Sequence, residues 1–217
     1  MMKRLFLTIL MTIGLLPAVA QITHTAKGDV DLNAEKILKK AAQKMNGDAV
    51  SFSVTMVNKD ANKKETARQK AEVIYKQGKY KVSFDGNVIY CDGTATWHWN
   101  QEANEVVVNK MSEAEDDLMN PAAILANYSK NFRAKYIRQD QNGNAIIDLT
   151  PKKSKSYHKI RFIINAESGL IKQMEMHNYD SSCGEYHVSK FAQAKVTAQT
   201  FAFPKGEHPD VEIIDMR

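Results

Sequence analysis

The hydrophobic residues of segment 31–45 recur at the spacing of a helix. They fall near every 3.6 residues, and lysines occupy the opposite side. An Asn-Gly pair at 46–47 follows as a typical helix stop. The pattern therefore predicts an amphipathic helix over 31–45. Its apolar face consists of Leu32, Ile37, Leu38, Ala41, Ala42 and Met45.

Most of the remaining chain alternates hydrophobic with polar residues, which is the period of a half-buried β-strand. Tight-turn dipeptides such as Asp85-Gly86 and Asp92-Gly93 separate the alternating segments. Many strands with local connections predict a twisted antiparallel sheet that curls into a barrel or half-barrel. The predicted strands are 50–56, 71–75, 80–84, 88–91, 95–99, 105–109, 132–139, 145–149, 159–165, 170–178 and 185–191.

Two short helices are predicted between the two groups of strands. Ser112 and Glu115 fit a capping box, and the acidic residues that surround them favour the start of a helix. A second helix runs through Tyr128, with Asn120 as its cap and Pro121 at its first position. We therefore expect an α+β fold. It is an unclosed, half-barrel antiparallel sheet covered by the amphipathic helix and these two lid helices.

The first twenty residues have the organisation of a secretory signal peptide. A short basic start at 1–4 precedes an apolar stretch at 5–16, and Ala18-Val19-Ala20 supplies small residues for cleavage. The alternative is an uncleaved anchor helix, but a bilayer span needs roughly 20 apolar residues. The pattern predicts cleavage after Ala20, export to the periplasm, and one domain over 21–217.

The charge of the chain sets a limit on its partners. Thirty Lys and Arg residues face 25 Asp and Glu residues, and the net charge of +5 is too small to indicate a nucleic-acid binder. Cys91 and Cys183 are the only cysteines. An oxidising compartment would permit a disulfide between them, but two buried thiols fit the sequence equally well.

Residues for catalysis or metal binding form no recognisable constellation. HExxH, GxSxG, GxxxxGK and GxGxxG are absent, and the six histidines lack metal-ligand spacing. His177 and His187 flank one predicted hairpin, but no third ligand accompanies them. The cationic stretch 152–161 fits a solvated loop, or a patch that approaches anionic headgroups or an acidic partner. We expect a protein that is no enzyme and uses no cofactor.

Several short motifs stand in a fixed order along the chain. They are Asp92-Gly93-x-x-x-Trp97-x-Trp99 after a strand, Asn120-Pro121 with Leu125, Leu149-Thr150-Pro151-Lys152, and Phe201-x-Phe203-Pro204 followed by segment 211–217. In this order they resemble the LolA family of periplasmic lipoprotein carriers, and the similarity runs from about residue 31 to the end. The resemblance implies an unclosed barrel with an apolar cavity that shields lipoprotein acyl chains between the inner and outer membranes.

The resemblance directs attention to large apolar residues expected on the inner face of the strands and on the lid. A structural core would use the same residue types, so packing is the alternative role for each of them. The candidate lipid-binding residues are Phe52, Val54, Met56, Tyr75, Tyr80, Val82, Phe84, Trp97, Trp99, Leu118, Ile124 and Leu125.

The same resemblance implies a latch and partners. The family has an Arg-Pro pair that latches the lid, and here the matching position is Lys76, which lacks the planar fork of arginine. The implied partners are acylated lipoproteins, an inner-membrane lipoprotein-releasing ABC transporter and an outer-membrane acceptor, with the carrier itself a monomer. The alternative function is a sensory or scaffold module that uses this fold to bind lipoprotein or lipid in the envelope.

Overall fold

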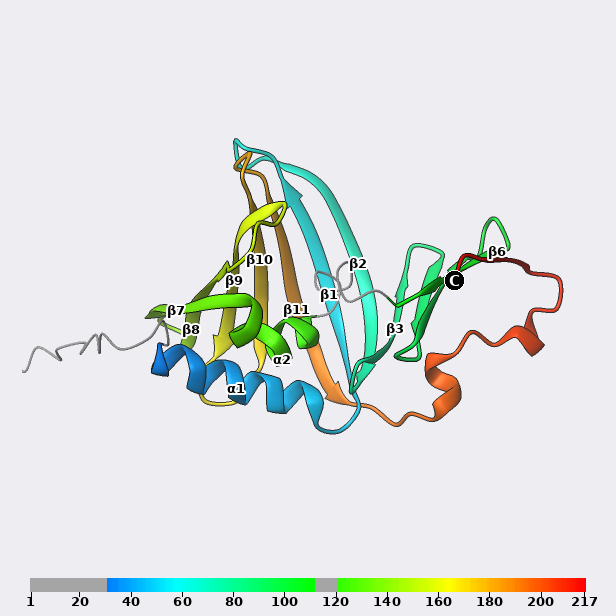
Figure 1. The fold of residues 1–217 in the computed structure, drawn as a ribbon, viewed down its shortest axis with the longest axis horizontal. Coiled ribbons are helices and arrows are strands. Elements are labelled where there is room, and N and C mark those ends of the chain that lie inside the picture. The colour runs from blue at the N-terminus through cyan, green and yellow to red at the C-terminus, as the bar shows by residue number, and fades with distance from the viewer. Residues whose placement is uncertain (1–30, 112–120) are drawn as a thin grey trace, which may run out of the picture.

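The computed structural model describes residues 31–111 and 121–217. A single curved sheet dominates it, with the strand order β12-β6-β5-β4-β3-β2-β1-β11-β10-β9-β8-β7. The two ends of this order do not pair with each other, so the predicted unclosed antiparallel half-barrel is confirmed (Figure 1). The predicted signal peptide, the capping box at 112–115 and Leu118 lie outside the described residues.

The strands extend most of the predicted segments by a few residues at their ends. Each neighbouring pair is antiparallel except β12 with β6, which is parallel. The strands are β1 Val50–Lys59, β2 Glu65–Lys76, β3 Lys79–Phe84, β4 Asn87–Cys91, β5 Ala95–Asn100, β6 Glu105–Lys110, β7 Phe132–Gln139, β8 Asn144–Pro151, β9 Tyr157–Asn165, β10 Ile171–Asn178, β11 Cys183–Gln193 and β12 Glu212–Asp215.

Helix α1, Leu32–Asn46, matches the predicted amphipathic helix and is capped by the residue before it. Leu32 was expected on its apolar face but is 69% exposed, because it begins the helix ahead of the buried residues Ala34, Leu38, Ala41 and Met45. The Asp31 carboxylate accepts hydrogen bonds from the backbone N–H groups of Asn33 (3.0 Å) and Ala34 (3.1 Å). Its second oxygen accepts from the backbone N–H of Tyr136 on β7 at 2.8 Å. One side chain therefore starts the helix and joins it to the edge of the sheet.

Helix α2, Pro121–Asn131, begins at the predicted proline and continues three residues beyond the predicted end at Tyr128. Strand β7 follows it directly. Ile124 and Leu125 are both 1% exposed and pack into the same cluster as the apolar face of α1. The two helices therefore bury their apolar sides against one face of the sheet (Figure 1).

A second hydrophobic cluster lies on the other face of the sheet, over β4, β5 and β6. It comprises Val88, Tyr90, Ala95, Val106, Val108 and Phe203, with Trp97, Trp99 and Val211 packed against it. The C-terminal segment covers this cluster through two short 3₁₀ helices, Ala198–Phe201 and Lys205–Glu207, before it forms β12 (Figure 1). The C-terminal segment therefore packs on the outer face of β4, β5 and β6, and β4 alone of the three also supplies side chains to the main core on the inner face.

Strand β4 supplies side chains to both clusters because successive residues point to opposite faces. Ile89 and Cys91 pack in the main core, while Val88 and Tyr90 pack in the second cluster. Cys183 lies on β11, which β1, β2 and β3 separate from β4 in the sheet. No disulfide joins Cys91 to Cys183 in the described structure.

The cationic stretch 152–161 is partly neutralised on the sheet. Arg161 donates two hydrogen bonds to the carboxylate of Asp148, at 2.7 and 2.9 Å, and the Nζ atom of Lys159 lies 3.6 Å from it. Lys152 donates to the Ser129 carbonyl at 2.7 Å. The partners of these three cations belong to the protein itself. Among the residues that the structure describes, no helix has the length and hydrophobicity that a bilayer span requires.

Candidate functional site

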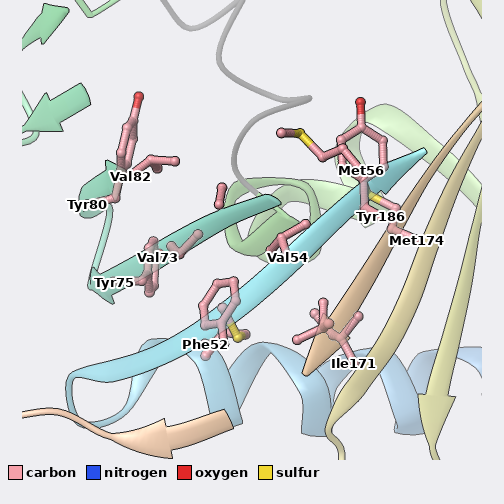
Figure 2. Close-up of a pocket in the computed structure, with 13 residues that line it drawn as sticks. Phe52, Val54, Met56, Val73, Tyr75, Tyr80, Val82, Ile171, Met174 and Tyr186 are labelled. Carbon is pink, nitrogen blue, oxygen red and sulfur yellow. The ribbon is translucent and has the colours of Figure 1, made fainter. Parts of the chain in front are cut away.

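An apolar cavity lies between the curved sheet and helix α1. Its walls come from β1, β2 and β3 on one side and from β10 and β11 on the other (Figure 2). Met45 of α1 also lines it. The lining residues are Met45, Phe52, Val54, Met56, Ala71, Val73, Tyr75, Tyr80, Val82, Ile171, Met174, Tyr186 and Val188.

None of these thirteen lining residues is charged at neutral pH. Burial raises the pKa of the Tyr75 hydroxyl and that of the Tyr186 hydroxyl, so both phenols stay neutral. The Tyr75 hydroxyl also donates to the Asn46 side-chain oxygen (3.2 Å) and accepts from the Gly78 backbone N–H (2.9 Å). Its polar end is thereby satisfied by protein groups, and its ring faces the cavity.

The cavity has a volume of about 60 Å³. A water molecule needs roughly 10–15 Å³ of such space, so the cavity has room for a few waters only. Met45, Met56 and Met174 contribute unbranched, adaptable side chains to the wall. A guest larger than a few atoms would therefore have to displace parts of the wall.

The structure brings half of the sequence-predicted candidates to this cavity. Phe52, Val54, Met56, Tyr75, Tyr80 and Val82 line it. Phe84, Ile124 and Leu125 belong to the same hydrophobic core without lining the cavity. These three residues pack in the core around the cavity, Phe84 from β3 and the other two from α2.

Trp97 and Trp99 lie on the face of the sheet opposite to the cavity. The Trp99 ring packs edge-to-face on Phe203, with ring centroids 5.5 Å apart, and lies 4.4 Å from the ring of His208. The sequence analysis expected both tryptophans on the inner face, and their position in the second cluster corrects that expectation. The reason is the C-terminal segment, which covers the apolar face of β5 on the outer side of the sheet.

Lys76, the candidate latch, lies at the end of β2 and is exposed. Tyr75 precedes it and lines the cavity, so strand alternation places the Lys76 side chain on the outer face. It stands directly across from Lys79 in the β2–β3 hairpin. Its surroundings are those of an exposed hairpin.

Sequence reasoning missed part of the far wall. Ile171, Met174, Tyr186 and Val188 line the cavity from β10 and β11, which pair with each other and, through β11, with β1. Tyr186 and Val188 alternate on β11, and Met174 stands between two polar neighbours, so part of this wall had a sequence signal. Ile171 lies three residues before Met174, across a register shift in β10, and so falls outside simple alternation.

His177 and His187 do not face each other. His177 pairs across the sheet with Cys183, and His187 pairs with Gln173 and Thr55. Each imidazole instead lies beside a glutamate of its own strand, Glu175 at 2.9 Å and Glu185 at 3.2 Å. Within 31–111 and 121–217, no group of three or more His, Cys, Asp or Glu residues could hold a metal ion.

The sequence is similar to outer membrane lipoprotein carrier proteins. The family described as outer membrane lipoprotein carrier protein LolA matches residues 78–204. The outer-membrane lipoprotein carrier protein of Vibrio cholerae serotype O1 is 27% identical over 136 residues, which are 61% of this chain and 64% of that protein. The chain thus spans about 64% of the length of the curated relatives that it matches.

A solved structure shares the fold. An uncharacterized conserved protein from Thermus thermophilus superposes with a TM-score of 0.57 and 14% identity, covering 84% of this chain and 98% of that one. Because the LolA match covers more than half of the sequence and the open, curved sheet agrees with it, the chain belongs to the LolA family of outer membrane lipoprotein carrier proteins.

Proposed function

We propose that this protein is a periplasmic carrier that shields the acyl chains of lipoproteins in its cavity and moves them from the inner to the outer membrane. The observation that carries the proposal is the uncharged, apolar cavity on the inner face of an open sheet. Each acyl CH₂ group exposed to water costs about 0.8 kcal/mol, so an acylated protein needs such a shelter to cross an aqueous compartment. The LolA family membership supports the same conclusion.

The small volume of the cavity bears on how such a guest would be held. An acyl chain enters only if the walls move apart, and the free energy of that movement lowers the net affinity. A carrier benefits from this reduction because it must release its cargo at the second membrane. Flexible methionine side chains in the wall allow the guest-filled cavity to repack without one fixed shape.

The remaining parts of the proposal follow the family. The chain is exported and cleaved after Ala20, and residues 21–217 act as one monomeric domain. It receives cargo from an inner-membrane lipoprotein-releasing ABC transporter and delivers it to an outer-membrane acceptor. The carrier performs no catalysis and needs no cofactor, since sheltering a lipid changes no covalent bond.

Binding is tested by one pair of variants on neighbouring positions of β1. Val54 lines the cavity, whereas Thr55 points to the outer face and pairs with His187 and Lys70. Val54→Glu places a carboxylate in an apolar site, and we expect it to weaken binding of a fluorescent triacylated lipopeptide by at least about tenfold. Thr55→Glu adds the same charge on the other face and should leave the affinity unchanged. Equal affinities for the two variants would overturn the proposal.

Transport is tested separately from binding. Inner-membrane vesicles that contain the ABC transporter and a labelled lipoprotein are incubated with ATP and the protein, and the soluble complex is then added to outer-membrane vesicles. A carrier brings the lipoprotein into the soluble fraction and delivers it. Binding without delivery would instead support the sensory or scaffold role.

A further inference from the structure

Strand β3 pairs with only the C-terminal part of β2. Residues 72–76 of β2 pair with residues 79–83 of β3, whereas β2 has 12 residues and begins at Glu65. Seven residues, 65–71, therefore continue past the last pair with β3. Figure 1 shows β2 rising away from the β3–β6 part of the sheet. No strand of the described residues pairs with 65–71 on that side, although β1 pairs with it on the other.

This unpaired edge, residues 65–71, adjoins the cavity. Ala71 lines the cavity and also lines a groove of about 310 Å³ at the fork between β2 and β3. The groove includes Phe84, Asp85 and Asn87 from the end of β3 and the start of β4. A chain that leaves the cavity beside Ala71 therefore meets unpaired backbone N–H and C=O groups at once.

The length of the edge suits a peptide strand. Seven residues at about 3.3 Å each give an edge of about 23 Å, enough for several main-chain hydrogen bonds. Its exposed side chains carry both signs of charge, including Glu65, Arg68 and Lys70. Arg68 and Glu65 form an ion pair with each other, at 2.6 Å, which leaves no strong preference for one charge on a partner.

We propose that the extended peptide which follows the acylated N-terminus of a cargo adds to the sheet as a strand along residues 65–71 of β2. The inference rests on the proposed function, because it requires the acyl anchor to occupy the cavity. Recognition by strand addition uses backbone hydrogen bonds, so it accepts peptides of differing sequence. That property suits a carrier with many cargoes. It also closes an exposed strand edge, which folded proteins otherwise protect from pairing with other chains.

The test uses the full chain and three triacylated lipopeptides with the same eight-residue peptide. One is unmodified, one carries N-methyl groups at two odd-numbered residues, and one carries them at two even-numbered residues. In an added strand, alternate residues point their N–H groups toward the neighbouring strand. We expect one methylated lipopeptide to bind at least about tenfold more weakly than the unmodified one and the other to bind within about twofold of it. Equal affinities for both methylated lipopeptides would overturn the inference.

Amide hydrogen exchange gives the second readout. The amides of residues 65–71 should gain protection with the unmodified lipopeptide, but not with a diacyl lipid that has no peptide. The amides of β7, the edge strand at the far end of the sheet, serve as the control.

The outcomes distinguish the inference from the function on which it rests. Binding of both ligands without added protection at 65–71 would overturn the inference and leave the proposed function intact. Failure of both ligands to bind would overturn the two together. Protection at 65–71 that rises with protein concentration alone would assign the edge to a second copy of the chain, and would also overturn the inference.

Discussion

Replacing Gly169 by alanine tests how closely the sheet is fitted to helix α1. Gly169 lies in the β9–β10 turn at a φ of +74°, in the left-handed region that glycine tolerates. A Cβ atom there would lie 3.2 Å from both the backbone carbonyl carbon and oxygen of Lys40 on α1. The left-handed conformation costs a residue with a Cβ about 1 kcal/mol. Crowding against a helix backbone that cannot yield adds roughly 1–3 kcal/mol.

The matched control is Gly86→Ala. Gly86 has a φ of +73°, almost the same as Gly169, but a Cβ there would meet nothing within 4 Å. The control should therefore lose only the conformational part, about 1 kcal/mol, whereas Gly169→Ala should lose about 2–4 kcal/mol.

The assay is urea unfolding followed by circular dichroism, which gives the free energy of unfolding for each variant and for the parent. The difference between the two variants isolates the contact between the turn and α1. Equal losses, within about 0.5 kcal/mol, would refute the reasoning that this turn supports the helix through direct backbone contact.

Three further predictions concern stability. Asp148→Asn should destabilise the protein by about 1–3 kcal/mol at pH 7. Burial, the largest single influence, raises the Asp148 pKa, but the hydrogen bonds from Arg161 together with the charges of Arg161 and Lys159 hold the pKa below its usual value. The deficit should therefore shrink as the pH falls below about 4, and a constant deficit down to pH 2 in urea titrations would contradict this. Asp31→Asn should keep the helix cap yet lose the hydrogen bond from the Tyr136 N–H. The midpoint of its thermal unfolding should therefore lie between those of the parent and Asp31→Ala, and equal midpoints for the two variants would contradict this. Phe203→Ala should cost about 3 kcal/mol in urea unfolding and leave lipopeptide affinity unchanged, whereas weaker binding by a folded variant would link the second cluster to the cavity.

Much of the fold was predictable because its signals are local. Alternation in segments such as 50–56 and 80–84 identified the strands, and the 3.6-residue spacing identified α1. The residues of β1 to β3 that point into the core were also predictable, since only one face of these strands is apolar. Six cavity-lining residues were therefore identified from the sequence.

The sequence could not show which side of the sheet some apolar side chains occupy. Val88, Ile89, Tyr90 and Cys91 are consecutive apolar residues, so the pattern shows a strand but not which side faces which core. Strand β5 does alternate, with Ala95, Trp97 and Trp99 on one face, but the alternation does not tell which core that face meets, so Trp97 was expected on the wrong side of the sheet. Its true side depends on the C-terminal segment, which lies about a hundred residues further along the chain.

Strand β12 was not predicted for a related reason. It has four residues, all exposed, and so lacks the alternation that marks a half-buried strand. Its place is set by parallel pairing with β6, which begins at Glu105. A pairing between segments so distant in the sequence has no local signal.

The packing of β4 on both of its faces distinguishes a stiff part of the sheet from parts that deform more easily. Bending β4 would disrupt two buried layers at the same time. The walls formed by β1, β2, β10 and β11 have only one such layer, because their outer sides carry polar residues such as Thr55 and Glu175. Any swelling that admits a guest must therefore be taken up by these walls, while β4 keeps its shape.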